Sequence, residues 1–467
     1  MPQIDPSRIK KILVVRPDAI GDLVLTTAAI AALKIKYPQA HIAVLARKYN
    51  QIIVKNNPAV DEVISDDIFD CIAKHKKIGI TKYRHWIQYL KQKKFDLMIN
   101  FYSEFPYALI GFLAKITFRI GDKGKILFSW LYNFPVKQNF KNMAVHEVEH
   151  QFELLKPLGI EMTGESKLKI YPTAEALAKG KKIISENGLQ GKKLIAINLG
   201  SGGSDKAWAI KNVQALIKAL AKKYETKTIL LGGPDEKAFA EKILPEISEF
   251  IVDQVGLSFD ALFGIISQMH LFIGNNTGPT HIASALQIPT VVTYNSKFQK
   301  PGRWAPWANR HKVIKVVSKC PYPCNPPICK RDICTTEISV DDVLLAAEEL
   351  LAGKGSLSKE EDKLERARLS FNILTFGNDP LKNKILKQLK DKNWRVWDIS
   401  AEDLKKIGLR DLLDFLFRYD INIIHAMGQS SPKLKIAALL SCLKSPSPII
   451  YLNYKGSDLN HYLDLIK

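Results

Sequence analysis

The stretch KILVVRPDAIGDLVLTTAAIAALKIKYP, residues 11–38, decides the fold of the chain. It begins with a β-branched apolar run at residues 12–15, which is short enough to be one buried parallel strand. A loop follows at residues 16–21, and a run rich in Ala and Leu then shows helical spacing, with Leu23, Thr27 and Ile30 on one face. Pro38 ends this run. The stretch therefore predicts a strand, a loop and a helix.

Asp22 falls in the first turn of the predicted helix. A helix N-terminus carries free N–H groups and a partial positive charge, so it attracts anions and favours an ionised carboxylate. Asp22 could therefore be a base that works beside a nucleotide-sugar phosphate. This stretch alone leaves open the alternative that an acidic residue simply makes a good helix start.

Length and patterning indicate several α/β domains. A chain of 467 residues exceeds one typical hydrophobic core. Alternating strand and helix patterns predict parallel sheets in domains at residues 1–172 and 173–352, then a linker at 353–369 and a small α/β unit at 370–467. No signal peptide and no run of roughly 18 apolar residues is evident, so we expect a cytoplasmic protein.

The charge balance predicts an anionic partner. The chain has 68 basic and 47 acidic residues, a net charge of +21. The candidates are nucleotide phosphates, a phosphorylated glycolipid, a membrane surface and nucleic acid. The basic residues occur in short runs without interleaved aromatics, and no nucleic-acid motif is present, so a nucleic-acid partner is not expected.

The second half of the chain begins with a strand and a glycine-rich loop. The strand is expected at residues 193–199; Gly200 and Ser201 follow it, and Lys206 comes five residues later. A glycine turn that exposes N–H groups, with a lysine nearby, suits a diphosphate. Neither the ATPase P-loop nor the G-x-G-x-x-G fingerprint is present, so the loop is only a candidate phosphate site.

Two more loops follow predicted strands in this half. The first, GGPDE, contains Asp235 and Glu236. The second lies in LFIGNNTGPTHIASALQIPTVVTY, residues 271–294, where the loop opens a helix. Because open α/β sheets bind ligands at the carboxyl ends of their strands, this loop predicts a second ligand site. Its candidate ligand-binding residues are Asn276, Thr277, Gly278 and His281.

Two metal-like patterns compete with these interpretations. HEVEH, residues 146–150, fits the zinc-protease pattern H-E-x-x-H, but positions 153 and 156 lack the Gly and His of the extended form. The alternative is an interdomain helix with two exposed histidines. Four cysteines also cluster as C-x3-C-x4-C-x4-C, where free thiols, a disulfide or a structural metal site are open. They are Cys320, Cys324, Cys329 and Cys334.

Several long motifs resemble one family. RPDAIGDLVLTTAAIAALK, HEVEHQFELLKPLGI, KAW, GGPDE and IGNNTGPTHIASAL are similar, in order, to the ADP-heptose:lipopolysaccharide heptosyltransferases of glycosyltransferase family 9. The resemblance covers residues 10–351. It implies a GT-B fold, in which two Rossmann-like domains face a cleft, and it removes the zinc-protease interpretation because the family has this segment without metal. HAMGQSSPKLKIAALLSCLKSPSPIIYLNYKGSDL, near the C-terminus, resembles the N-terminal half of family 4 glycosyltransferases.

The resemblance assigns roles by position. Asp22 matches the general base, Lys206 the phosphate-contacting lysine, and Asp235 or Glu236 the contact to the nucleoside ribose. The loop from Asn276 to His281 matches the donor diphosphate loop, although the family usually has Asp where this chain has Asn276. Arg16 and Gly21, in the loop before Asp22, are assigned to the acceptor side.

The implied activity is an inverting, metal-independent sugar transfer without a cofactor. The expected donor is a nucleotide-diphospho-sugar such as ADP-heptose, and the expected acceptor is an anionic glycolipid, the lipopolysaccharide core or a related glycan. Peripheral contact with the cytoplasmic face of the inner membrane would follow. Two alternatives stay open: a GT-B-like nucleotide-sugar epimerase, and a catalytically silent protein that binds a glycan or nucleotide-sugar.

Overall fold

The structure is a computed structural model with three parallel β-sheets. It describes residues 4–354, except 75, 126, 139–144, 165, 203–204, 297–298, 317–328 and 330–332, and beyond residue 354 it describes four strands. The chain divides into two compact units, residues 1–318 with 326–358, and residues 319–325 with 359–467. The first unit contains two α/β halves, called here the N-terminal half (residues 4–172) and the C-terminal half (residues 173–354).

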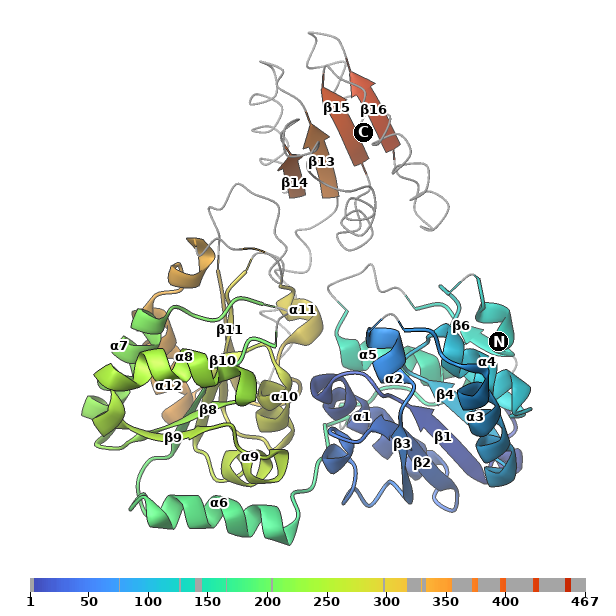
Figure 1. Cartoon of the computed structure of the whole chain (residues 1–467), viewed down its shortest axis with the longest axis horizontal. Coiled ribbons are helices and arrows are strands. Elements are labelled where there is room, and N and C mark those ends of the chain that lie inside the picture. Colours follow the sequence, from blue (N-terminus) through green and yellow to red (C-terminus); the bar gives the residue numbers. More distant parts are fainter. Residues whose placement is uncertain are drawn as a thin grey trace. The chain divides into compact units, whose positions relative to one another are not determined.

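The N-terminal half is a six-stranded parallel sheet of order β3-β2-β1-β4-β5-β6 (Figure 1). Its strands are β1 (Lys11–Val15), β2 (His41–Arg47), β3 (Glu62–Asp66), β4 (Leu97–Asn100), β5 (Phe118–Asp122) and β6 (Phe134–Val136). Its α-helices are α1 (Ile20–Lys36), α2 (Phe69–Ala73), α3 (Ile80–Lys93), α4 (Phe105–Leu113) and α5 (Glu147–Leu155).

The C-terminal half repeats this topology with the order β12-β11-β10-β7-β8-β9. Its strands are β7 (Ile195–Asn198), β8 (Thr228–Gly232), β9 (Ile251–Val255), β10 (Leu271–Asn275), β11 (Thr290–Tyr294) and β12 (His311–Lys315). Its α-helices are α6 (Ala174–Glu186), α7 (Ile210–Tyr224), α8 (Lys237–Ile243), α9 (Phe259–Ile266), α10 (Gly278–Ala285), α11 (Pro301–Trp304) and α12 (Val340–Leu351).

The alternation of side chains along β1 explains why both faces of the N-terminal sheet are covered. Ile12 and Val14 join one hydrophobic cluster, whereas Leu13 and Val15 join another beneath α3 and α4. A strand buried on both faces needs a continuous apolar run, which the sequence at residues 12–15 provides. The first of these clusters continues into the C-terminal half, where it includes Ile282 of α10.

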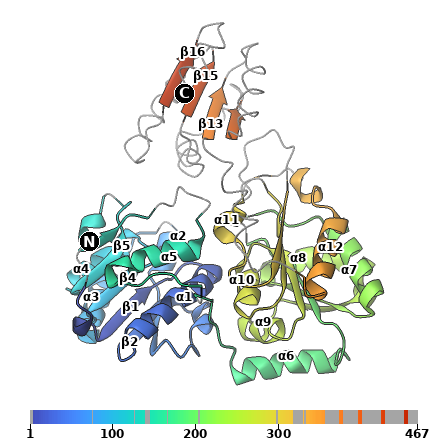
Figure 2. The same cartoon turned by 180° about the vertical axis from the view of Figure 1, so that it is seen from behind.

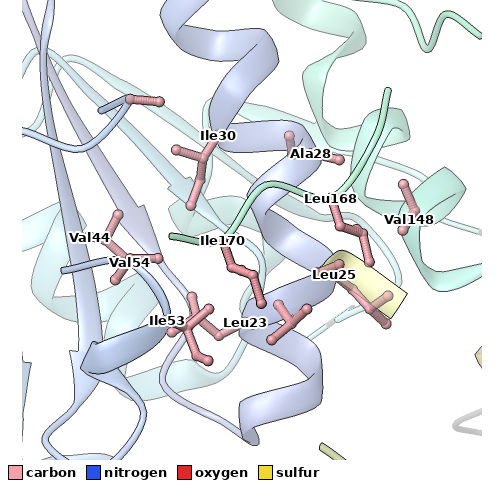
Figure 3. Packing of buried hydrophobic residues seen from close by; sticks show 14 of the residues in the cluster. Leu23, Leu25, Ala28, Ile30, Val44, Ile53, Val54, Val148, Leu168 and Ile170 are labelled. Atoms are coloured by element: carbon pink, nitrogen blue, oxygen red, sulfur yellow. The ribbon is translucent and has the colours of Figure 1, made fainter. Parts of the chain in front are cut away.

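Helix α1 is buried on nearly every side, which differs from the single apolar face expected from the sequence. It packs against α5 and also against α10 of the C-terminal half. Figure 3 shows Leu23, Leu25 and Ile30 among side chains from β2, from α5 and from the segment that contains Leu168 and Ile170. The helix is therefore a central element of the first unit, and its Ala and Leu content allows close approach from several directions.

The second unit contains a four-stranded parallel sheet of order β14-β13-β15-β16 (Figure 2). Its strands are β13 (Asn372–Phe376), β14 (Arg395–Ile399), β15 (Ile423–Met427) and β16 (Ile450–Tyr454). These four parallel strands fall within the small α/β unit predicted at residues 370–467, whose other residues lie outside the described part of the chain.

Replacing Leu25 by Ala tests the central place of α1. Leu25 is fully buried, so the truncation should leave a cavity and lower the free energy of unfolding by about 2–5 kcal/mol. The measurement is the midpoint of urea unfolding, which is monitored by circular dichroism. The matched control is Ile35→Ala on the same helix, because Ile35 is 78% exposed and should change stability little. Equal losses in both variants would contradict the packing described.

Candidate active site

The predicted site residues lie at the carboxyl edges of the two sheets. In each half the first strand lies beside the fourth, β1 beside β4 and β7 beside β10, which is the order of a doubly wound sheet. Ligands of such sheets bind at the carboxyl ends where the strand order reverses. The loops after these strands are residues 16–19 and 101–104 in the N-terminal half, and 199–209 and 276–277 in the C-terminal half.

Arg16 organises the loop after β1. Its guanidinium donates to Asp22 Oδ1 at 2.6 Å, to Glu147 Oε1 at 3.1 Å and to the carbonyl of Phe101 at 2.8 Å. Its Nε lies 3.0 Å from Asp18 Oδ1. The side chain of Arg16 is only 4% exposed, whereas that of Asp22 is 19% exposed. Arg16 therefore holds three carboxylates from within the protein, and Asp22 remains within reach of a substrate.

The protonation of these carboxylates follows from burial and from two arginines. Burial raises the pKa of Asp22, although Arg16 opposes this shift, and burial also raises the pKa of Asp18 well above its usual range. The pKa of Glu147 is lowered, because the charges of Arg16 and Arg303 outweigh its burial. Burial therefore opposes the ionised form of Asp22 that a helix N-terminus favours.

Glu147 connects the two halves. Its Oε2 accepts from Nε and Nη2 of Arg303 at 3.1 and 2.8 Å, and its Oε1 accepts from Arg16. Arg303 belongs to α11 of the C-terminal half, and Glu147 is the first residue of α5. Both hydrogen bonds from Arg303 converge on this one oxygen, and charge-assisted hydrogen bonds of this kind are stronger than those between neutral groups. The position of α11 is thus tied through Glu147 to the arginine that holds Asp22.

The two histidines of HEVEH are buried, so the expectation of exposed histidines is wrong. His146 is 2% exposed and His150 is 0% exposed. His146 precedes α5 as its N-cap; its Nδ1 accepts from the N–H of Val148, and its Nε2 lies 2.9 Å from the carbonyl of Ala305. Its ring also packs on Trp307. This segment holds the halves together, which explains the burial.

Helices α1 and α10 meet at their N-termini. A Cβ atom on Gly21 would lie 2.7 Å from Cδ2 of His281, and a Cβ atom on Gly278 would lie 3.0 Å from Cγ2 of Ile20. The first distance is too short for any side chain, so Gly21 is required by this contact. His281 is buried and its pKa is lowered to about 3, chiefly by burial and also by His146, so its imidazole is neutral. Asp22 therefore lies one residue from the contact with the predicted donor loop.

The predicted donor loops also meet one another. A Cβ atom on Gly200 would lie 3.3 Å from Oε1 of Glu236, and Asn275 Nδ2 donates to the Gly200 carbonyl at 3.0 Å. A Cβ atom on Gly202 would lie 3.7 Å from Cγ2 of Thr277. Asp235 is exposed, whereas Glu236 is half-buried and faces this junction. Of the two acidic candidates, the structure places Glu236 nearer the other loops; Ser201 lies half-buried in the same loop as Gly200.

Lys206 is supported by a buried polar network that the sequence did not reveal. Asp205 is 4% exposed and accepts from the N–H groups of Lys206 and Asn295 at 2.8 and 2.9 Å. Asn295 Nδ2 donates to the Lys206 carbonyl and to Asn275 Oδ1. The ammonium of Lys206 donates to the carbonyl of Cys329. The network thus joins the Lys206 loop to the end of β10.

Two polar atoms, one in the loop after β10 and one near the start of α10, lack a hydrogen-bond partner among the described residues. They are Asn276 Oδ1 and His281 Nδ1, and both atoms are buried. Asn276 Nδ2, by contrast, donates to Gln299 Oε1 at 3.1 Å. Because buried polar atoms are normally hydrogen-bonded, these two atoms are candidates for contacts to a ligand.

The cysteine cluster is described only in part. Cys320 and Cys324 lie outside the described residues, whereas Cys329 and Cys334 are described. Among the described residues, no group of three or more His, Cys, Asp and Glu side chains is arranged to hold a metal ion. The described part of the chain also has no helix with the length and apolar character needed to cross a membrane.

Sequence reasoning identified the loops but missed the residues that connect them. Glu147 was visible only as part of a zinc-like motif, and Arg303 had no sequence signal at all. Asp205 directly precedes Lys206, and an acidic residue beside a lysine that is predicted to contact phosphate could have indicated a positioning role. Asp18 could have been found by its place in the same loop as Arg16.

Comparison with known proteins identifies the class. The family model "Glycosyltransferase family 9 (heptosyltransferase)" matches residues 83–332, more than half of the chain. A putative glycosyltransferase of Haemophilus influenzae is 28% identical over 72% of this chain and 95% of its own length. Lipopolysaccharide heptosyltransferase 3 of Escherichia coli is 25% identical over 71% and 96%. The chain belongs to glycosyltransferase family 9, and it is a glycosyltransferase.

Solved structures support the same fold. The family 9 glycosyltransferase of Veillonella parvula has a TM-score of 0.66 at 22% identity and covers 75% of this chain and 99% of its own. The ADP-heptose heptosyltransferase II of Escherichia coli has a TM-score of 0.58 at 21% identity and covers 73% and 99%. The prediction of a GT-B fold is confirmed.

The pair formed by Glu147 and Arg303 can be tested by a double-mutant cycle. Arg303→Met leaves a buried carboxylate with Arg16 alone and should lower the free energy of unfolding by about 3 kcal/mol. The double variant Glu147→Gln/Arg303→Met should lose less than the sum of the two single variants. Urea denaturation measures all four proteins. Strictly additive losses would show that the two side chains do not interact.

Asp205 should give stability a characteristic pH dependence. Burial raises its pKa from 3.8 to about 6, so the folded chain binds this proton more tightly than the unfolded chain. The free energy of unfolding should therefore fall by at most about 3 kcal/mol as the pH rises from about 4 to about 6. Above that range this contribution should stay level. Asp205→Asn removes this contribution. The difference between wild-type and variant urea midpoints should change over that pH range, and a constant difference would contradict the assignment.

Proposed function

We propose that this chain transfers a sugar from a nucleotide-diphospho-sugar to a glycolipid, with inversion and without a metal ion. The donor proposed is ADP-heptose, and the acceptor is the lipopolysaccharide core or a related glycan. The observation that carries the proposal is the contact between α1 and α10. Gly21 and His281 are 260 positions apart in the sequence, yet they touch beside Asp22.

Asp22 is the general base in this proposal. An acceptor hydroxyl must lose its proton as it attacks the anomeric carbon, and one carboxylate on the side opposite the leaving group is enough for inversion. Burial, which raises the pKa of Asp22, makes the carboxylate more basic. The hydrogen bond from Arg16 at 2.6 Å fixes its orientation, while its partial exposure leaves a path for the acceptor.

The C-terminal half supplies positive charge for the departing diphosphate. Thr277, the N-cap of α10, makes no side-chain cap hydrogen bond, so the start of this helix can receive an anion. The ammonium of Lys206 would exchange the carbonyl of Cys329 for a phosphate oxygen. These groups would stabilise the charge that develops on the leaving group. Glu236 would accept from the ribose.

The relatives' names support the proposed donor and acceptor. Heptosyltransferases that act on lipopolysaccharide or lipooligosaccharide recur among them, and one solved relative contains ADP-2-deoxy-2-fluoro heptose. Peripheral contact with the inner membrane would bring the chain to such an acceptor. We also retain the proposed boundaries, with residues 1–172 on the acceptor side and 173–352 on the donor side.

Replacing Asp22 by Asn should abolish nearly all transfer while donor binding persists. The amide keeps the size of the side chain but cannot take the acceptor's proton, and loss of a general base typically costs about 10²–10⁴-fold in rate. Transfer from ADP-heptose to truncated lipopolysaccharide is followed by ADP release, and donor binding by calorimetry. Retained turnover would eliminate Asp22 as the base.

A comparison with Lys206→Ala separates the two halves of the proposal. This variant should bind the donor more weakly and also turn over more slowly, because Lys206 is proposed to contact the phosphates. Incubation of the wild type with a panel of NDP-sugars and no acceptor distinguishes the alternatives. Rapid interconversion of the donor alone would indicate an epimerase, and binding without any turnover would indicate a silent binding protein.

A further inference from the structure

Exposed apolar side chains gather on one surface of the N-terminal half. The described residues include twelve exposed large hydrophobic side chains, and five of them fall within residues 105–130. Leu127 is 86% exposed and Trp130 is 65% exposed. We call the five residues the aromatic patch: Phe105, Phe112, Leu113, Leu127 and Trp130.

The aromatic patch is continuous between α4 and the segment after β5. The rings of Phe112 and Trp130 are 5.7 Å apart between centroids, and so are those of Phe105 and Phe128. The indole N–H of Trp130 donates to the carbonyl of Leu127 at 3.3 Å. Contacts between two elements therefore hold these side chains together as one patch. Hydrophobic residues scattered singly over a surface would not be joined in this way.

The charges around the aromatic patch are mainly positive. Residues 104–131 contain Lys115, Arg119, Lys123 and Lys125 against two acidic residues: Asp122 is buried, and Glu104 pairs with Lys125 at 2.7 Å. Lys115 and Lys123 are exposed, and the guanidinium of Arg119 lies 5.4 Å from the centroid of the Phe112 ring. Aromatic and aliphatic tips surrounded by basic residues match the interface of an anionic bilayer, where the rings enter the headgroup region and the cations meet lipid phosphates.

The aromatic patch begins beside the active site. The carbonyl of Phe101 accepts from Arg16, and Phe105, four residues later, begins α4. In both views α3 and α4 lie on the side of the N-terminal sheet away from the C-terminal half (Figures 1 and 2). A surface on this side would contact lipid while both halves keep their contact at the site.

We infer that the aromatic patch binds the surface of an anionic lipid bilayer and so presents Asp22 to an acceptor that is anchored there. The inference deepens the proposed function, because only a lipid-anchored acceptor gives such contact a purpose. Leu127 lies in a turn and is strongly exposed, so its side chain protrudes from the surface. A side chain that inserts between lipid headgroups must protrude in this way. A groove for a peptide or a partner helix would instead be concave.

The test is co-sedimentation of the full chain with vesicles. The wild type should bind vesicles of phosphatidylcholine mixed with phosphatidylglycerol, and bind vesicles of phosphatidylcholine alone much more weakly. Leu127→Ser/Trp130→Ser should bind the anionic vesicles at least about tenfold more weakly, because two apolar side chains no longer leave water. Lys115→Gln/Lys123→Gln should weaken binding to the anionic vesicles and reduce its dependence on salt.

The matched control is Ile35→Ser/Leu345→Ser, which removes two exposed apolar side chains outside the patch, 78% and 58% exposed. This control should bind as the wild type does. The inference is overturned if the wild type does not bind anionic vesicles, or if the patch variant binds equally well. It is also overturned if size-exclusion chromatography shows a wild-type dimer that the patch variant lacks while vesicle binding is unchanged.

Transfer to a water-soluble fragment of the acceptor separates this inference from the proposed function. The patch variant should transfer to the soluble fragment at the wild-type rate and to vesicle-bound acceptor more slowly. Transfer to the fragment without vesicle binding would remove the membrane inference and leave the proposed function intact. Vesicle binding without any transfer would leave the membrane contact intact and contradict the proposed function.

Discussion

The buried carboxylate of Glu147, held between Arg16 and Arg303, is the interaction on which the site depends. Taking three charged groups out of water is costly, and such a cluster persists only when each charge has partners in good geometry. Here the partners come from both halves of the first unit. The orientation of Asp22, through Arg16, and the place of α11, through Arg303, are therefore set by one side chain.

The same arrangement supports the proposal that a basic carboxylate works near an anionic donor. Asp18, Asp22 and Glu147 bring three negative charges against two arginines, so one carboxylate is disfavoured as an anion. The C-terminal half contributes the start of α10, Lys206 and a neutral His281. The three carboxylates come from the N-terminal half and the groups proposed to receive the donor come from the C-terminal half, and the contact between α1 and α10 brings them together.

The fold was predictable from the sequence because its strands are continuous apolar runs bounded by loops. Residues 12–15 show this in the N-terminal half, and residues 271–273 show it in the C-terminal half. Asp22 and the loop after β10 could be found because motif and secondary structure coincide there. The partnership of Glu147 with Arg303 could not, because it joins residues 156 positions apart and depends on how the two halves pack. The burial of His146 and His150 was missed for the same reason.

Gly21 and Gly278 limit which substitutions the chain can accept at the contact between its two halves. Each lies against a side chain from the other half, so the tolerance at one position is set by a residue that is remote in sequence. Hybrids that join the N-terminal half of one relative to the C-terminal half of another must preserve both contacts at once. The two contacts therefore require the N-terminal and C-terminal halves to evolve together as a matched pair.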